Sequence, residues 1–377
     1  MLPTLLAKGR RQLGVALCLL GAGSALAPSL RAEASPSPEM GQGRAPAPTV
    51  HAASALGAGA WCVHAGAPSV GAPVIDRRGR VTVATTDGYV HSFERRGRYR
   101  WSYTLSGAVA GPVAHRSKDG ALWVGTTDRQ LYSIAADGRL LGRITTAAPV
   151  ATGLVRRSDG SLIYGSGRAL YATTAFGGAR WRMDLGAVPS GPPVPGLENV
   201  TWVAAGRELL RVEGAWRLRR FPLPGEALGP PLKLPQGVAV VAGGDLLSFD
   251  DAGQLRWSRG DVAVAAVAGR GLVGVSPRGE VRWFDADGRQ LERSSPAGDE
   301  GGRGELGAPA AAPGVLAGVA YVPLLSGELV GIDRQGQVVR RWQLSTAPLG
   351  ELAIDVTGRR LLATVLGGRV CSVPLVE

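Results

Sequence analysis

Lysine, cysteine, histidine and aromatic residues are all scarce in this chain of 377 residues. Lysine occurs only as Lys8, Lys118 and Lys233, so nearly all of the positive charge is carried by arginine. The arginines are scattered, without a basic block or a stripe interleaved with aromatics, which argues against a nucleic-acid partner. Although the formal net charge is +12, we expect a solvated surface. A face that binds acidic lipid or polysaccharide is the alternative.

Recognisable catalytic motifs are also missing. The only histidines are His51, His64, His91 and His115. None stands in a His-Glu-x-x-His arrangement or at metal-ligand spacing with a cysteine. The chain has no P-loop, no Rossmann fingerprint and no Gly-x-Ser-x-Gly elbow where the required strand and helix could form. We therefore predict no catalytic, metal-binding or cofactor-binding residue.

The longest apolar run, Leu13 to Ala27, is too short to span a bilayer comfortably. It follows a basic start and precedes small residues suited to cleavage, so residues 1–32 are predicted to be a secretory signal peptide. Arg10-Arg11 leaves twin-arginine export open, and Cys18 makes lipid attachment a weaker alternative. The mature protein is therefore expected in the periplasm or outside the cell. Residues 33–56, rich in Pro, Ala, Ser and Gly, are expected to be a disordered spacer.

The rest of the chain repeats one phrase, in which a short apolar strand leads to a turn with a glycine. That glycine recurs at steps of 40, 41, 39, 37, 39, 35 and 48 residues, at Gly57, Gly97, Gly138, Gly177, Gly214, Gly253, Gly288 and Gly336. A period near forty in a strand-rich chain predicts an all-β, eight-bladed β-propeller of four-stranded blades over residues 57–377. The longest step contains the Gly- and Pro-rich loop 294–314, which we expect to be either functional or disordered.

Four of these glycines are followed four residues later by tryptophan. The pairs are Gly57 and Trp61, Gly97 and Trp101, Gly177 and Trp181, and Gly253 and Trp257. The glycine is expected to supply a positive φ in the turn before the fourth strand. The tryptophan on that strand is expected to cover the seam to the next blade. The other tryptophans are expected to pack between blades rather than form a ligand cage, namely Trp123, Trp202, Trp216, Trp283 and Trp342.

These phrases resemble the tryptophan-docking repeat of the PQQ-like, or quinoprotein-type, β-propellers. Two examples are VHSFERRGRYRW at 90–101 and LLSFDDAGQLRW at 246–257. That family includes quinoprotein alcohol dehydrogenases and the propeller lipoprotein of the outer-membrane barrel assembly machine. The dehydrogenases carry adjacent cysteines beside the cofactor and often a haem domain, whereas this chain has neither a Cys-Cys pair nor a Cys-x-x-Cys-His motif. The resemblance thus implies the scaffold without the catalytic set.

The two ends of the repeat region complement each other. The segment at Trp61 resembles a fourth strand without the three that should precede it, and residues 351–376 hold three strands without a fourth. We therefore predict that the N-terminal strand completes the last blade, which places Cys62 beside Cys371. With Cys18 removed these are the only cysteines, so a disulfide is predicted, with two free thiols as the alternative.

These expectations favour a non-catalytic, exported, monomeric scaffold that binds a protein partner in the bacterial cell envelope. Outer-membrane protein assembly is the candidate process, and any membrane contact is expected to be indirect. The alternative is an enzyme or sensor that binds PQQ or another small molecule in the central funnel.

Overall fold

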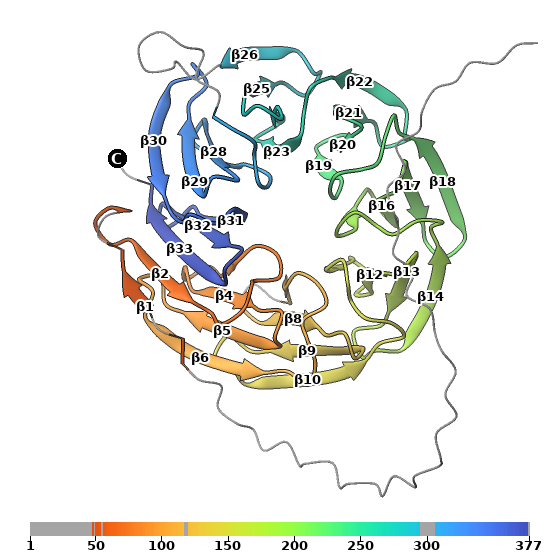
Figure 1. The fold of residues 1–377 in the computed structure, drawn as a ribbon. Helices are drawn as coiled ribbons and strands as arrows, with labels where there is room; N and C mark the ends of the chain where they lie inside the picture. Colours follow the sequence, from red (N-terminus) through yellow and green to blue (C-terminus); the bar gives the residue numbers. More distant parts are fainter. Residues whose placement is uncertain (1–46, 49, 54–55, 117–119, 295–305, 376–377) are drawn as a thin grey trace, which may run out of the picture. The chain divides into compact units, whose positions relative to one another are not determined.

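The computed structural model describes residues 47–48, 50–53, 56–116, 120–294 and 306–375. Within these ranges the regular elements are all strands, in eight antiparallel sheets arranged as a ring (Figure 1). The prediction of an all-β, eight-bladed propeller is confirmed. The signal peptide expected at 1–32 lies outside the described residues.

Each of the first seven blades is a meander of four strands that are consecutive in sequence, because short turns join neighbouring antiparallel strands. Blade 1 consists of β3 (Val74–Ile75), β4 (Val81–Ala84), β5 (Tyr89–Phe93) and β6 (Tyr99–Thr104), and blade 2 of β7 (Ala114–His115), β8 (Leu122–Gly125), β9 (Gln130–Ile134) and β10 (Leu140–Thr145). Blade 3 consists of β11 (Leu154–Arg156), β12 (Leu162–Ser166), β13 (Ala169–Thr173) and β14 (Ala179–Asp184). Blade 4 consists of β15 (Val194–Pro195), β16 (Val200–Ala205), β17 (Glu208–Glu213) and β18 (Arg217–Pro222).

Blades 5 to 7 repeat this order. Blade 5 consists of β19 (Leu232–Leu234), β20 (Gly237–Ala242), β21 (Asp245–Phe249) and β22 (Leu255–Arg259). Blade 6 consists of β23 (Val264–Ala268), β24 (Gly271–Val275), β25 (Val281–Phe284) and β26 (Gln290–Ser294). Blade 7 consists of β27 (Gly314–Leu316), β28 (Val319–Pro323), β29 (Glu328–Ile332) and β30 (Val338–Gln343). Residues 295–305 of the long loop lie outside the described ranges, and β27 follows that loop.

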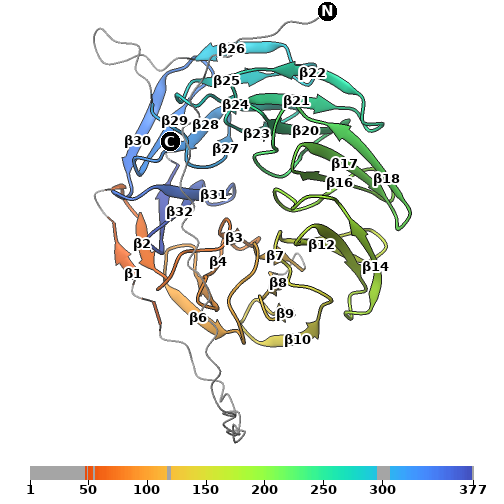
Figure 2. The ribbon, with the colours of Figure 1, turned by 45° about the vertical axis from the view of Figure 1, so that its right-hand side comes forward.

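Blade 8 is built from both ends of the chain. It joins β31 (Leu349–Asp355), β32 (Arg360–Val365) and β33 (Arg369–Pro374) to β2 (Trp61–His64), which pairs with β33. Figures 1 and 2 both show the orange N-terminal strands beside the blue C-terminal ones. The predicted closure of the ring is confirmed.

A further strand, β1 (Val50–Ala52), pairs with the outer side of β2. It lies inside the segment 33–56 that was expected to be a disordered spacer, so that expectation is wrong for these residues. Its backbone pairs with the open edge of β2, which would otherwise present unpaired N–H and C=O groups. The sheet of blade 8 therefore has five strands.

The hydrophobic core is divided among the seams between blades. One cluster joins blade 4 to blade 5 through Trp202, Val240 and Phe249, and corresponding clusters fill the other seams. Most of the second strands are buried along their whole length, as β4 and β16 are. Outer strands such as β10 alternate between more and less exposed residues because only one face packs inward.

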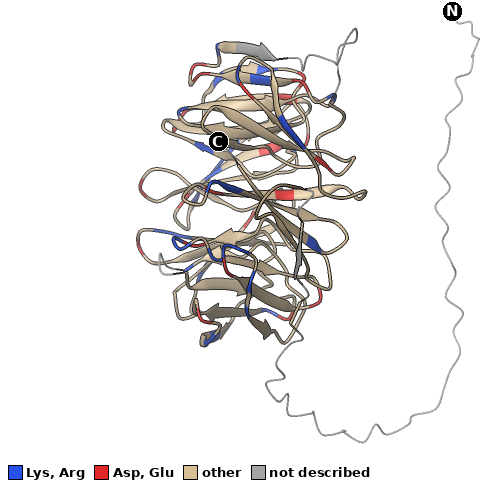
Figure 3. Ribbon diagram, turned by 90° about the vertical axis from the view of Figure 1, so that its left-hand side faces the viewer, with Lys and Arg blue, Asp and Glu red and all other residues tan. Residues whose placement is uncertain are grey.

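The antiparallel meander gives the ring two distinct faces. Turns between the first and second strands and between the third and fourth strands lie on one face, which we call the turn face. Turns between the second and third strands, and the links from one blade to the next, lie on the other, which we call the link face. Seen edge on, many charged residues lie in connections at these faces (Figure 3).

Candidate functional site

Three tryptophans dock their blades onto the next blade of the ring. The indole Nε1 groups of Trp61, Trp101 and Trp257 donate hydrogen bonds of 3.1 Å to the carbonyls of Arg95, Ala136 and Ala286, respectively. Each acceptor lies two residues before the glycine of the next blade's turn. The bond satisfies the one donor of a largely apolar ring at the seam.

The glycine of each acceptor turn leaves room for the indole. A Cβ added at Gly97 would lie 2.6 Å from Cγ of Trp61, and one at Gly138 would lie 2.7 Å from Cγ of Trp101. Both glycines have positive φ, of 85° and 89°, which favours glycine in these turns. The glycine of one phrase therefore packs against the tryptophan of the preceding phrase.

Other side chains replace tryptophan at two seams. Ile144 lies against Gly177, and Phe221 lies against Gly253. Gly57 instead has Pro374 and Arg340 as its neighbours. Thus Gly177 and Gly253 accept a side chain from the preceding blade, as Gly97 does, but that side chain is not tryptophan.

Trp181 departs from the docking arrangement. It is half buried and, like Met183 and Leu218, packs against the buried cluster at the seam between blades 3 and 4. A Cβ built on Gly214, the corresponding glycine of the next blade, has no atom within 4 Å. The turn there is shorter, because Glu213 pairs directly with Arg217, and its glycine does not come under the preceding blade's indole.

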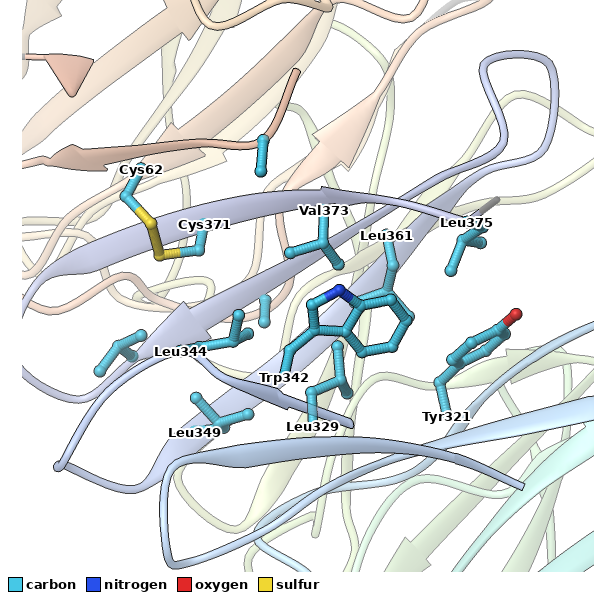
Figure 4. Packing of buried hydrophobic residues seen from close by; sticks show 13 residues of the cluster. Cys62, Tyr321, Leu329, Trp342, Leu344, Leu349, Leu361, Cys371, Val373 and Leu375 are labelled. Atoms are coloured by element: carbon cyan, nitrogen blue, oxygen red, sulfur yellow. A yellow bond between two sulfur atoms is a disulfide. The ribbon is translucent and has the colours of Figure 1, made fainter. Parts of the chain in front are cut away.

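The predicted disulfide is present and locks the closure of the ring. Cys62 and Cys371 are opposite each other in the β2–β33 ladder, and their sulfurs are 2.07 Å apart. Figure 4 shows the bridge beside the apolar cluster around Trp342 and Leu361.

Arg360 adds a polar clasp at the same place. Its side chain is buried, donates from Nε to Ser372 Oγ at 2.9 Å, and donates from Nη2 to the Gly59 carbonyl at 2.7 Å. Burial lowers the pKa of Arg360, and nearby Asp355 partly offsets this by favouring the charged form. The clasp thus joins β32 and β33 to the segment that precedes β2.

Most of the remaining tryptophans pack between blades, as predicted. Trp123, Trp202, Trp283 and Trp342 are buried, and arginine guanidinium groups lie over their rings: Arg116, Arg211, Arg334 and Arg340. For Trp216 the prediction is wrong, because the short turn of blade 4 leaves this side chain 91% exposed. Trp216 follows Gly214 by two residues rather than four, and this spacing could have identified it as a turn residue.

The histidines are not assembled into a site. His91 is buried in β5, where its Nδ1 lies 2.6 Å from Ser102 Oγ. Its pKa is lowered because burial disfavours the imidazolium more than Asp87 and the backbone of Ala65 favour it. Among the described residues, no three His, Cys, Asp or Glu side chains are grouped to hold a metal ion. The same residues include no helix long and apolar enough to cross a membrane.

The link face carries exposed aliphatic side chains that the sequence analysis missed. Val188 and Leu228 stand in consecutive links on either side of blade 4, and Leu325 and Leu366 stand in equivalent turns of blades 7 and 8. All four are more than half exposed. The sequence could have predicted the exposure of two of them. Leu325 and Leu366 stand in the β-turn position that threonine occupies in the Thr85-Thr86 and Thr126-Thr127 turns of other blades. Exposed aliphatic side chains thus recur in corresponding connections of this face.

Comparison with known proteins gives one family match and many similar folds. Residues 47–178 match the sequence profile of the family described as "Outer membrane protein assembly factor BamB". No curated protein matches the chain in sequence. The matched residues run from just before β1 to the turn after β13, and therefore include blades 1 and 2 and most of blade 3.

Two crystal structures illustrate the similarity in fold. BamB from Moraxella catarrhalis is 17% identical, with a TM-score of 0.66 over 82% of this chain and 97% of that one. The computationally designed Ika8 protein is 14% identical, with a TM-score of 0.63 over 81% of this chain and 96% of that one. The chain thus resembles the BamB-type, PQQ-like propellers, in sequence over its first blades and in fold around the whole ring.

Proposed function

We propose that this chain is a non-catalytic scaffold of the bacterial cell envelope that binds a protein partner through its link face, in outer-membrane protein assembly. The observation that carries the proposal is the set of exposed aliphatic residues on that face, Val188, Leu228, Leu325 and Leu366. Protein partners cover side chains of this kind and so remove apolar surface from water. The match of residues 47–178 to the assembly-factor family supplies the process.

The proposal includes export, a monomeric ring and the absence of a quinone cofactor. The disulfide between Cys62 and Cys371 supports export, because such bonds persist mainly in oxidising compartments. The basic start and apolar run within residues 1–32 support it independently. The resemblance to quinoproteins makes cofactor binding the competing function. Titration with PQQ and calcium, followed by tryptophan fluorescence, tests it: saturable quenching would favour an enzyme or sensor.

Site-specific photocrosslinking tests the partner surface. A photoreactive amino acid is placed at Val188 or Leu228, and in a matched control at Leu255, which is similarly exposed but lies on outer strand β22. In cells, the link-face positions should crosslink to one discrete envelope protein, identified by mass spectrometry as an outer-membrane assembly component. The control position should not yield that product. Equal yields from all positions, or no discrete product, would contradict the proposed surface.

A further inference from the structure

Three turns of blades 8 and 1 meet around one guanidinium group on the turn face. Arg95, in the β5–β6 turn, has its Nε 2.8 Å from Asp355 Oδ2 and donates from Nη2 to Thr357 Oγ1 at 2.7 Å. Gly79, in the β3–β4 turn, lies against the same side chain. The connections β3–β4, β5–β6 and β31–β32 therefore form one continuous surface.

Exposed arginines surround this junction. We define the arginine patch as Arg77, Arg78, Arg96, Arg98 and Arg359, all of which are exposed. The acids of the same turns are paired with other arginines: Asp76 with Arg80, Glu94 with Arg100 and Asp355 with Arg95. Among the described acids, none forms a salt bridge with a member of the patch. The patch therefore presents uncompensated positive charge.

Two aromatic side chains project from the same face, on neighbouring blades 3 and 4. Phe176 and Trp216 are each 91% exposed and lie in the corresponding β13–β14 and β17–β18 turns. The turns that carry them are ordered. Thr174 Oγ1 accepts from the Phe176 N–H at 3.3 Å, and the Gly214 N–H donates to the Asn199 carbonyl at 3.3 Å. Leu197, more than half exposed, extends from the turn that contains Asn199.

We propose that the turn face docks on the surface of an anionic lipid bilayer, with the arginine patch on the headgroups and Phe176 and Trp216 entering the interface. Positive side chains are attracted to anionic lipid within a Debye length of the surface. Tryptophan and phenylalanine favour the boundary between headgroups and acyl chains. Because the patch and the aromatic tips stand on different blades of one face, a flat surface contacts both at once.

This assignment favours a membrane over a soluble polyanion. A nucleic acid or an acidic protein would satisfy the arginines, but it would give no reason for two unstacked aromatic tips that stand blades away from the patch. The inference is independent of the proposed protein partner, because that partner uses the link face. It differs from the expectation that membrane contact is only indirect.

Vesicle flotation of the full chain tests the inference. Vesicles of phosphatidylcholine alone are compared with vesicles that also contain phosphatidylglycerol, at low and high salt. The protein should float only with phosphatidylglycerol, and salt should weaken binding. The Arg78→Glu/Arg96→Glu variant should bind about tenfold more weakly or worse. Its control, Arg168→Glu/Arg207→Glu, carries the same charge change on exposed residues of the link face and should bind like the parent.

A second pair of variants separates a membrane from other anions. Phe176→Ser/Trp216→Ser should bind phosphatidylglycerol vesicles several-fold more weakly than the parent, but should bind a short DNA duplex no differently. If this variant floats like the parent, the face is a general anion binder and the membrane assignment is overturned. Equal loss in the link-face control, or flotation with phosphatidylcholine alone, would also overturn it. Thermal melting of each variant verifies that the ring is folded.

Discussion

At the scale of single residues, glycine and tryptophan have complementary roles at the blade seams. A glycine with positive φ leaves the space into which the preceding blade's indole fits, as Gly138 does for Trp101. The sequence phrase identifies both residues but does not reveal that they contact partners in different blades. That pairing depends on how neighbouring blades are offset around the ring.

Substitution of Gly138 separates the cost of backbone conformation from the cost of contact. Gly138→Ala should destabilise the protein by about 2–4 kcal/mol, because the methyl group meets Trp101 and the φ of 89° is unfavourable. Gly160→Ala is the control, since its φ is 79° but a Cβ there has no atom within 4 Å. It should cost about 1–2 kcal/mol, the cost of the left-handed backbone conformation alone. Urea unfolding measures both, and equal losses would show that the tryptophan contact is unimportant.

His91 makes stability depend on pH. Its lowered pKa means that the unfolded chain takes up a proton first as the pH falls below about 6.5. Stability is therefore full above that pH and is lost as the pH falls through the folded-state pKa. The melting temperature of the parent should fall more between about pH 7.5 and 5.5 than that of His91→Gln. Identical pH profiles would show that His91 does not contribute.

At the scale of strands and blades, periodicity predicted the architecture well. The repeat predicts that the eight inner strands begin at Val74, Val113, Leu154, Pro193, Leu232, Val264, Ala311 and Leu352. Four of these starts are confirmed, at Val74, Leu154, Leu232 and Val264. Two strands begin one residue later than predicted, at Ala114 and Val194. The last two begin at Gly314 and Leu349, each three residues from the predicted start. The strands at Gly314 and Leu349 start directly after an Ala-Pro pair, as the strand at Val74 does. An Ala-Pro pair therefore directly precedes three of the eight inner strands.

The strand β1 was missed because three residues in a Pro- and Ala-rich segment carry no period. Only pairing with β2 orders them, through partners such as Val63 for Val50. A strand that only adds to the edge of a sheet has no apolar face of its own, so its sequence shows no hydrophobic periodicity from which it could be predicted.

The surfaces could be predicted less well than the fold. Apolar repeats report burial, whereas the exposure of Trp216 results from a turn shortened by the direct pairing of Glu213 with Arg217. Similarly, the arginines are evenly scattered in sequence. Only the convergence of three turns on Arg95 gathers some of them in one patch.

The docking of one blade on the next can be measured at Trp257. Trp257→Ala should cost about 3–5 kcal/mol, because it empties a buried site and leaves the Ala286 carbonyl without its donor. Trp181→Ala, at the seam where docking is absent, should cost less, about 1–2 kcal/mol. Denaturant unfolding compares the two. A larger loss for Trp181 would mean that the hydrogen-bonded arrangement is not the main source of stability at these seams.

At the scale of the whole molecule, the ring is held by covalent and non-covalent closure at one blade. Replacing both Cys62 and Cys371 with serine should lower stability by about 2–5 kcal/mol, since the bridge spans 309 residues and restricts the unfolded chain. The melting temperature should fall in the double variant, and reductant should lower that of the parent but not that of the variant. If reductant leaves the melting temperature of the parent unchanged, the bond does not stabilise the ring.

Because blade 8 is assembled from both ends of the chain, it should be the last blade to form when the protein folds. During synthesis or transport, blades 1 to 7 can form and stack as their residues emerge, but β2 must wait for β33 at residues 369–374. Until then the edge of β2 and the open face of blade 1 remain available to other strands. The late pairing is also non-local, so the last step should be slow. The emerging chain would therefore depend most on chaperones just before its final residues arrive.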